Sequence, residues 1–329
     1  MVSKDEIKKY EIKKCQNTLK KIRNEISKIV IGQEVVVDAF LRAILCDGHA
    51  LVEGVPGIAK TTLIRALAAA TGCEHKRIQF TVDLLPADII GLTIYSKEKE
   101  KFVNIKGPIF ANFILADEIN RAPPKTQSAM LECMQEKSAT IEKVTYPLPV
   151  PFFVMATQNP LEQEGVYPLP EAQIDRFLFK ILMGYPKPKE EEKIVDTNIT
   201  IHKFEEYDLK PVTSPKDIMK MQAITKQIYA SPEICKYIVE IVNMTRDREK
   251  FALGKYVDWG GSPRASIGMY IASKASALME GSSFVKPQNV KDVAYDVLRH
   301  RIILNYEGRA EGITSEAVIK EILSKVPVP

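Results

Sequence analysis

The stretch Gly54-Val55-Pro56-Gly57-Ile58-Ala59-Lys60-Thr61 decides the fold of this chain of 329 residues. It follows a short apolar run at His49–Glu53, which we expect to form a strand, and it precedes an apolar helical pattern at Lys60–Thr71. A strand, a glycine-rich turn and a helix in this order are typical of a P-loop, in which backbone N–H groups bind phosphate oxygens. The sequence therefore predicts a phosphate site at the start of this helix.

The residue types of this loop suit phosphate binding, because small residues let the backbone approach the ligand and a helix N-terminus attracts anions. We expect Lys60 to reach the β- and γ-phosphates and the Thr61 hydroxyl to ligate Mg²⁺. Ala59 stands where the usual pattern has glycine, and alanine tolerates a positive φ angle poorly. The alternative is an ordinary glycine turn before a helix. The candidate nucleotide-binding residues of this segment are Gly54, Val55, Pro56, Gly57, Ile58, Ala59, Lys60, Thr61 and Thr62.

Two acidic residues, Asp117 and Glu118, directly follow the apolar run Ile114-Leu115-Ala116. A carboxylate at the C-terminal end of a strand in an open α/β sheet faces the ligand crevice. We expect Asp117 to hold Mg²⁺ through its water shell, and Glu118 to orient and deprotonate the attacking water. The alternative is a solvated acidic turn.

Another apolar run, Val154-Met155-Ala156, ends in polar residues that include Asn159. If this strand lies beside the Asp117 strand, Asn159 could hold the same water against the γ-phosphate. The alternative is a simple turn before Pro160, since asparagine favours such sites.

Apolar runs of strand length alternate with helical patterns over the first half of the chain, which predicts an α/β fold with a mostly parallel sheet covered by helices. The further expected strands are Arg77–Phe80, Asn112–Ala116, Pro151–Ala156 and Phe177–Met183, and an N-terminal helix spans Ile12–Ile29. Hairpins with polar tips are expected at Ile89–Ile105 and Thr140–Val150.

The composition changes near Pro186 and Pro188, beyond which we expect only helices. Three of these helices begin with serine followed by proline, at Ser214, Ser231 and Ser262, where serine caps the helix and proline occupies its first turn. We divide the chain into residues 1–189 and a helical domain at 190–329.

The overall composition fits a globular protein: 45% of residues are hydrophobic and 27% are charged, with a formal charge of +4. This mild charge does not require a nucleic-acid partner. No apolar stretch reaches the length of a membrane span, and the charged N-terminus is no signal peptide. Five widely spaced cysteines without a CxxC motif fit reduced thiols, so we expect a cytoplasmic protein.

Four stretches, GVPGIAKT, GPIFANFILADEINRAPPKTQSAMLECMQE, ATQNP and EGVYPLPEAQIDRFLF, together resemble the MoxR family of AAA+ ATPases. The resemblance is dense over residues 25–185 and looser over the helical remainder. It implies an AAA+ P-loop NTPase core with a C-terminal all-helical lid, which binds ATP and Mg²⁺ and works as a ring, usually a hexamer. Alanine before the P-loop lysine is also common in this family.

The resemblance assigns roles to single residues. Asn159 matches sensor 1, Arg176 matches the arginine finger that reaches the γ-phosphate of a neighbouring subunit, and Arg264 matches sensor 2 on the lid. Arg264 also lies in the first turn of its helix, where the helix dipole disfavours a cation. The alternatives are an ion pair of Arg176 with Asp175 or Glu171, and a surface arginine beside a carboxylate for Arg264.

Further expectations concern the base, the hairpins and the client. We expect adenine to lie between Val30-Ile31-Gly32 and Tyr185-Pro186, with Ile31 and Gly32 as contacts. Arg121 could also act across the subunit interface. The two hairpins match the helix-2 insert and the pre-sensor-1 hairpin, which in related rings face the pore or the substrate; the alternative is a packing role.

The resemblance implies an ATPase that remodels, assembles or activates protein clients, often proteins with von Willebrand A domains. One alternative is a DNA-dependent motor or loader, although no added DNA-binding domain is visible and nucleic acid is not the expected partner. Another is a nucleotide-dependent switch with negligible turnover.

Overall fold

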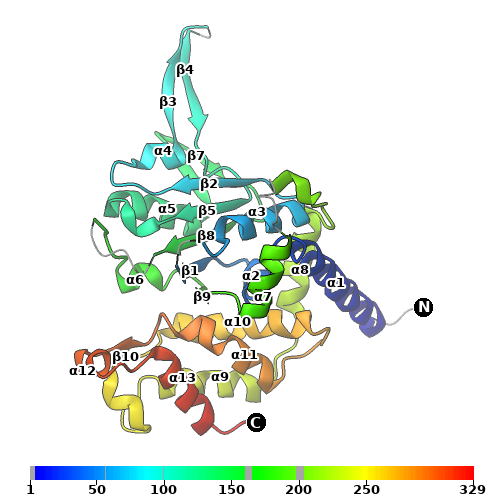
Figure 1. The fold of residues 1–329 in the computed structure, drawn as a ribbon, viewed down its shortest axis with the longest axis vertical. Coiled ribbons are helices and arrows are strands. Elements are labelled where there is room, and N and C mark those ends of the chain that lie inside the picture. The colour runs from blue at the N-terminus through cyan, green and yellow to red at the C-terminus, as the bar shows by residue number, and fades with distance from the viewer. Residues whose placement is uncertain (1–3, 56, 99, 160–164, 198–203) are drawn as a thin grey trace.

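The computed structural model describes residues 4–55, 57–98, 100–159, 165–197 and 204–329 (Figure 1). Pro56, which we expect in the phosphate loop, lies outside the described residues. A layered α/β part forms the upper half of the view in Figure 1, and a helical part lies beneath it. None of the helices in the described ranges is both long and apolar enough to cross a membrane.

The central sheet has five parallel strands in the order β2-β5-β8-β1-β9. These strands are β1 (Ala50–Gly54), β2 (His75–Gln79), β5 (Phe113–Asp117), β8 (Phe153–Gln158) and β9 (Phe179–Met183). All five expected strands are therefore confirmed, with ends shifted by at most two residues. The order places β5 beside β8 and β8 beside β1, so the segments that follow these three strands meet at one edge of the sheet.

Both faces of the sheet are buried. Successive side chains of a strand point to opposite faces, so neighbouring residues enter different buried clusters. On one face, Leu115 belongs to a cluster that includes buried residues of α1 (Lys4–Ile26), α2 (Glu34–Leu45) and α3 (Lys60–Thr71). On the other face, Ile114 and Ala116 belong to a second cluster. That cluster includes residues of α4 (Pro86–Ile90) and α5 (Pro124–Glu136).

Two antiparallel hairpins lie outside the central sheet. The strands β3 (Gly91–Ser96) and β4 (Lys101–Lys106) form a hairpin that projects along the long axis (Figure 1). The expected start at Ile89 was two residues too early, because Ile89 and Ile90 close the short helix α4. The second hairpin consists of β6 (Ser138–Ile141) and β7 (Val144–Pro147).

The two hairpins contact each other near their bases. Asn104 on β4 donates a hydrogen bond of 3.0 Å to the hydroxyl of Tyr146 on β7. The Lys106 ammonium also lies 5.0 Å from the centre of the Tyr146 ring, within the range of a cation–π contact.

The C-terminal part is mainly helical. Its helices are α7 (Pro188–Thr197), α8 (Pro215–Gln227), α9 (Pro232–Met244), α10 (Pro263–Met279), α11 (Pro287–Leu298), α12 (Tyr306–Ala310) and α13 (Ser315–Lys325). Its short 3₁₀ turns are η2 (Phe204–Tyr207) and η3 (Ala252–Tyr256). The expectation of helices alone was wrong, because β10 (Val257–Trp259) pairs with β11 (Ile303–Leu304). Strands this short leave no detectable alternation in the sequence.

The three serine caps are confirmed. The hydroxyls of Ser214, Ser231 and Ser262 accept hydrogen bonds from backbone N–H groups in the first turns of α8, α9 and α10, and a proline follows each serine. These caps satisfy helix donors that would otherwise lack a partner.

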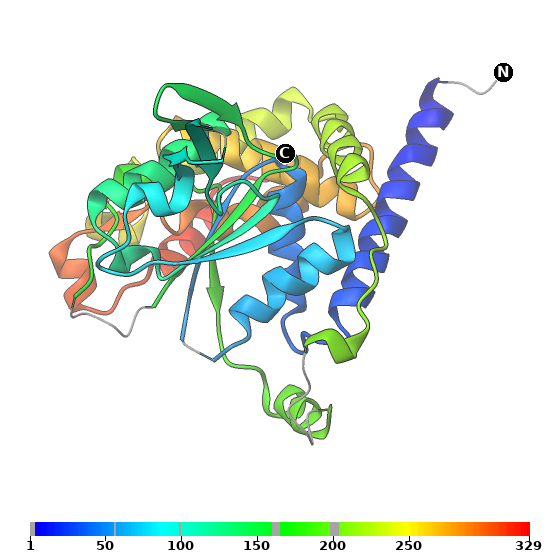
Figure 2. The same cartoon turned by 90° about the horizontal axis from the view of Figure 1, so that it is seen from above.

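The helical part shares a core with the first half of the chain, and Figure 2 shows from above how the helices flank the sheet. One buried cluster joins residues of α1, α2 and α3 to residues of α8, α9, α10 and α11. Gln222 of α8 donates a hydrogen bond of 2.7 Å to the carbonyl oxygen of Ile44 in α2. The division at residue 189 stays a prediction, and buried contacts run across it.

Candidate active site

The turn between β1 and α3 adopts the backbone that a phosphate loop requires. Ala59 has φ 65° and ψ 24°, which is the left-handed conformation, and Gly57 has φ 83°. Alanine therefore takes the conformation for which glycine is preferred, at a cost of about 1–2 kcal/mol. The Lys60 ammonium donates a hydrogen bond of 2.6 Å to the carbonyl oxygen of Gly54, so the loop closes on itself.

The expected phosphate-site residues come together in one cavity of about 350 Å³. The cavity is lined by Gly57, Ala59, Lys60, Thr61, Thr62, Asp117, Glu118 and Asn159. These residues come from three separate segments, at or after the C-terminal ends of β1, β5 and β8. The adjacency of these strands in the sheet explains why residues so distant in sequence meet here.

Lys60 lies in the field of both carboxylates. Partial burial lowers the pKa of its ammonium, and the negative charges of Asp117 and Glu118 act in the opposite direction. A lysine opposite two carboxylates is the charge arrangement expected for a site that receives both phosphate oxygens and a divalent cation.

The acidic pair is held by side chains that the sequence analysis missed. The Asp117 carboxylate accepts 2.7 Å hydrogen bonds from Thr157 Oγ1 and from Arg77 Nη2. The Glu118 carboxylate accepts from Gln79 Nε2 at 2.7 Å. Thr157 could have been noticed as a polar residue that ends an apolar strand. Arg77 and Gln79 could not, because their roles depend on β2 pairing with β5.

The backbone of Glu118 is also left-handed, with φ 58°. Its N–H donates to Thr157 Oγ1 at 2.9 Å, which ties the end of β5 to β8. Arg121 Nη1 lies 3.1 Å from Glu118 Oε2 within the same chain. The role of Arg121 across a subunit interface stays a prediction.

Thr61 and Asp117, the two expected metal ligands, line the same cavity. Their oxygens are the hard donors that Mg²⁺ prefers, and Mg²⁺ commonly takes only one or two protein ligands beside substrate phosphates. No cluster of three or more His, Cys, Asp or Glu side chains suited to a metal occurs in the described part of the chain, so no competing all-protein cage is seen there. The donor set therefore fits Mg²⁺ bound together with a nucleotide.

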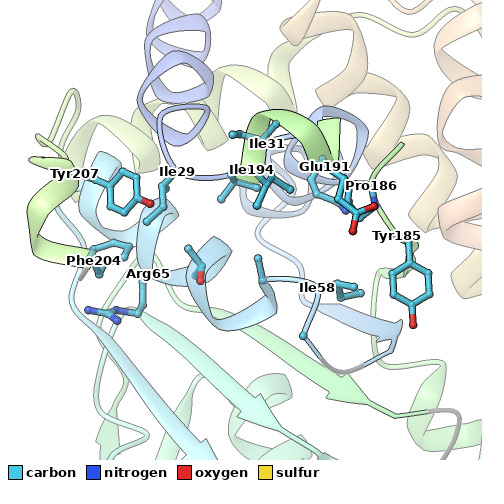
Figure 3. A pocket seen from close by; sticks show the side chains of 15 residues that line it. Ile29, Ile31, Ile58, Arg65, Tyr185, Pro186, Glu191, Ile194, Phe204 and Tyr207 are labelled. Carbon is cyan, nitrogen blue, oxygen red and sulfur yellow. The ribbon is translucent and has the colours of Figure 1, made fainter. Parts of the chain in front are cut away.

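A second cavity of about 550 Å³ opens beside the first and shares Gly57, Ala59 and Thr62 with it. Figure 3 shows this cavity between the start of α3 and the helix α7. Its lining includes Val30, Ile31, Tyr185 and Pro186, the segments expected to hold adenine, and also Ile58.

Some of the expected contacts do not line either cavity. Gly32, Gly54 and Val55 are not among the lining residues, although Gly54 accepts a hydrogen bond from Lys60 through its carbonyl oxygen. Gly32 has φ 75°, and a Cβ atom there would lie 2.6 Å from Glu190 Oε2. Gly32 therefore permits close packing of α7, and its contact with the base stays a prediction.

Other residues of this wall were missed by the sequence analysis. Glu191 and Ile194 of α7 and Phe204 and Tyr207 of η2 line the cavity. Arg65 of α3 lies 4.0 Å from the centre of the Phe204 ring, which holds η2 over the site. No sequence motif marks this part of the chain, so these positions could not be predicted from the sequence.

The two arginines matched to the arginine finger and to sensor 2 lie away from the phosphate cavity of their own chain. Arg176 and Arg264 line a third cavity of about 250 Å³ that shares no lining residue with the phosphate cavity. Arg176 is exposed and forms no ion pair with any described residue. The expected alternative for Arg264 is observed, because its Nη1 lies 3.5 Å from Asp175 Oδ2 and its side chain is 56% exposed.

A family model described as "ATPase family associated with various cellular activities (AAA)" matches residues 49–179, and an AAA lid domain model matches residues 252–322. Chaperone MoxR1 of Mycobacterium tuberculosis is 45% identical over 317 residues, covering 95% of this chain and 83% of that protein. Protein MoxR of Paracoccus denitrificans is 30% identical over 325 residues, covering 92% and 94%. The chain belongs to the MoxR family of AAA+ ATPases.

The fold of this MoxR-family protein also matches a solved structure. The crystal structure of a candidate ATPase from Cytophaga hutchinsonii superposes with a TM-score of 0.90 at 43% identity, covering 97% of each chain. The AAA match includes the phosphate-cavity residues and Arg176, and the lid match includes Arg264. The expected AAA+ core with a helical lid is thus confirmed, and nucleotide binding follows from the AAA domain.

Proposed function

We propose that this MoxR-family protein hydrolyses Mg²⁺-bound ATP at sites that a neighbouring copy completes within a ring. One observation carries the proposal. The phosphate cavity contains the lysine, the acidic pair and Asn159, whereas Arg176 and Arg264 line a separate cavity of the same chain. We infer that the arginine acting on the γ-phosphate comes from another subunit.

The residues of the phosphate cavity have complementary roles in this reaction. Lys60 exchanges the Gly54 carbonyl oxygen for phosphate oxygens, and the left-handed turn at Ala59 directs backbone N–H groups at them. Glu118 accepts the proton of the attacking water and Asn159 orients that water. Thr61 and Asp117 would hold Mg²⁺, which would neutralise negative charge on the phosphates.

Arg176 is the proposed finger. Its exposed guanidinium, with no ion-pair partner in the described residues, is available to an anion outside its own chain. An arginine supplied in trans accelerates phosphoryl transfer by about 10³–10⁵-fold in other NTPases. Arg264 lines the same cavity as Arg176 and would approach the same nucleotide site of the neighbouring subunit.

The ring, which we infer to be a hexamer, would remodel or activate protein clients. The name Chaperone MoxR1 of a relative supports this role. The projecting hairpin offers exposed apolar side chains for a client, namely Leu92, Ile94, Tyr95, Phe102 and Ile105. A client with a von Willebrand A domain and a cytoplasmic location stay predictions, the second supported by five free cysteines.

The test measures ATP turnover per subunit against protein concentration for wild type and Arg176→Ala. The matched control is Arg309→Ala, which removes an exposed arginine of α12. We expect turnover to rise cooperatively with concentration in wild type and in the control, but not in Arg176→Ala.

A mixing experiment tests the shared site directly. Subunits with Arg176→Ala retain their own Glu118, and subunits with Glu118→Gln retain their finger. Mixed rings should therefore regain part of the turnover that each variant lacks alone. Mixed rings that are shown to form by mass spectrometry and remain inactive would contradict a site built from two subunits.

A further inference from the structure

The carboxylate of Asp175, the residue immediately before the proposed finger Arg176, is held by three residues of the helical lid. Arg301 Nε donates to Oδ1 at 2.7 Å, Ser262 Oγ donates to Oδ2 at 3.2 Å, and Arg264 Nη1 lies 3.5 Å from Oδ2. Ser262 caps α10 and Arg264 lies in its first turn, whereas Arg301 lies just after α11. Asp175 belongs to the AAA match and the other three to the lid match, so one carboxylate joins the core to two segments of the lid.

Arg301 holds the backbone around the finger as well as the carboxylate. Its Nη2 donates to the carbonyl oxygens of Asp175, at 3.2 Å, and of Phe177, at 2.8 Å. These two residues lie immediately before and after Arg176. Because the Arg301 side chain is only 4% exposed, it stays in place as an anchor. The position of the finger therefore depends on the position of the lid.

Arg264 is the replaceable partner of the same carboxylate. Its contact with Asp175 is 3.5 Å long, which is the outer limit of a hydrogen bond, and its side chain is 56% exposed. An exposed ion pair of this kind is weak. Arg264 can therefore leave Asp175 for an anion of higher charge, while Arg301 remains bound to Oδ1.

The cavity of about 250 Å³ around Asp175 is rich in positive charge. Arg176, Arg264 and Arg301 line it, and Asp175 supplies the one carboxylate among its described lining residues. Such an excess of cationic groups attracts polyanions, and in the proposed ring the triphosphate of the neighbouring subunit is the polyanion that this cavity would meet. The charge of Asp175 lowers the repulsion between the guanidinium groups, so they can lie side by side before the phosphate arrives.

We propose that Asp175 is a positioning residue that sets both Arg176 and Arg264 for the nucleotide of the neighbouring subunit. The inference rests on the proposed shared site and adds the residue that holds its two arginines in register. Asp175 keeps Arg301 as its anchor and yields Arg264 to the neighbouring phosphate. Asp175 does not line the phosphate cavity of its own chain, so its loss should leave the nucleotide affinity of that cavity intact.

The first experiment compares Asp175→Asn with Asp296→Asn. Asp296 of α11 is the matched control, because its carboxylate also pairs with an arginine, at 2.6 Å, and its side chain is 16% exposed, against 19% for Asp175. Asp175→Asn should lower kcat by about 10- to 100-fold, the cost of misplaced catalytic groups, while affinity for the fluorescent ATP analogue MANT-AMP-PNP stays within about twofold. Asp296→Asn should change neither quantity. A kcat of Asp175→Asn equal to that of the control, or a loss of affinity as large as the loss of kcat, would overturn the proposal.

The second experiment asks in which subunit Asp175 acts. Asp175→Asn subunits are mixed with Glu118→Gln subunits, whose arginines are intact, and Arg176→Ala with Glu118→Gln is the reference mixture. Both mixtures should regain part of the turnover, which a loss of folding in the Asp175→Asn subunit would not allow. Rescue of the reference mixture alone would refute the role of Asp175. Failure of both mixtures, in rings shown by mass spectrometry to form, would instead refute the shared site.

The third experiment keeps Asp175 and does not depend on the folding of its variants. Ser262→Ala removes the cap of α10 together with one donor to Asp175, whereas Ser231→Ala removes the cap of another lid helix, α9. Both substitutions should lower Tm to a similar extent. Turnover should fall by about two- to tenfold in Ser262→Ala, the factor expected for one hydrogen bond, and should stay at the wild-type value in Ser231→Ala. Equal turnover in the two variants would count against Asp175 as the residue that positions the arginines.

Discussion

Arg301 Nε donates a hydrogen bond of 2.7 Å to the carboxylate of Asp175, the residue immediately before Arg176. The Arg301 side chain is only 4% exposed and also donates to the carbonyl oxygens of Phe177 and Leu178. Burial lowers the pKa of Arg301, and the Asp175 charge opposes this effect. A residue of the lid region therefore fixes the segment that carries the proposed finger.

Arg301→Met should lower the free energy of unfolding by about 3–5 kcal/mol, because it removes the buried partner of Asp175 and the donor to several carbonyl oxygens. Urea unfolding followed by circular dichroism measures the change. The control is Arg248→Met, whose side chain is 51% exposed and which should cost no more than about 1 kcal/mol. Equal effects of the two substitutions would contradict a structural role for the buried arginine.

Arg264→Ala should leave nucleotide affinity nearly unchanged and reduce turnover by about 10²-fold, because Arg264 lines neither the phosphate nor the adenine cavity of its own chain. MANT-AMP-PNP titration and steady-state ATPase assays give the two quantities. Lys60→Ala is the contrasting variant and should lose affinity, since Lys60 lines the phosphate cavity. A large loss of affinity in Arg264→Ala would place this arginine at the nucleotide of its own subunit.

Ala59→Gly should leave the free energy of unfolding unchanged or raise it by up to about 1 kcal/mol. Glycine relieves the strain of the left-handed conformation at φ 65°, and this gain offsets the greater entropy of glycine in the unfolded chain. Ala69→Gly, in the last turn of the helix α3 that follows, should instead cost up to about 1 kcal/mol. Thermal and urea unfolding of both variants test the contrast. A similar loss in both would show that position 59 gains nothing from glycine.

Stability should fall in mild acid because His49 is buried and neutral. Desolvation lowers its pKa from 6.5 to about 4, and its ring contacts the carbonyl oxygen of Met134 and the N–H of Val154. Between pH 6.5 and pH 4 the unfolded chain therefore binds more protons than the folded protein. The contribution of neutral His49 to stability is complete above pH 6.5 and is lost as the pH falls toward 4. The loss at pH 5 should reach about 2 kcal/mol.

Urea unfolding between pH 8 and pH 5 measures this dependence. His49→Gln, which keeps a neutral polar side chain, should flatten the curve. Desolvation also lowers the pKa of the half-buried His300, so part of the slope should persist in that variant. An unchanged slope in His49→Gln would assign the effect to other groups.

The features that the sequence predicted correctly are carried by short contiguous segments. The phosphate turn, the acidic pair after Ile114-Leu115-Ala116 and the serine caps each depend on residues a few positions apart, and hydrophobic runs mark the five strands. The strained backbone at Ala59 could also be anticipated, because the usual P-loop pattern has glycine at this position. The structure gives Ala59 the left-handed conformation.

Only the tertiary structure decided which side chains surround these segments. Arg77 and Gln79 reach the acidic pair because β2 pairs with β5, and Arg301 meets Asp175 across more than a third of the chain. The wall at Phe204 and Tyr207 and the separation of Arg264 from the phosphate cavity likewise follow from packing. Local periodicity records which face of an element is buried, but strand order and helix docking arise from contacts between distant segments, and no single stretch of sequence encodes them.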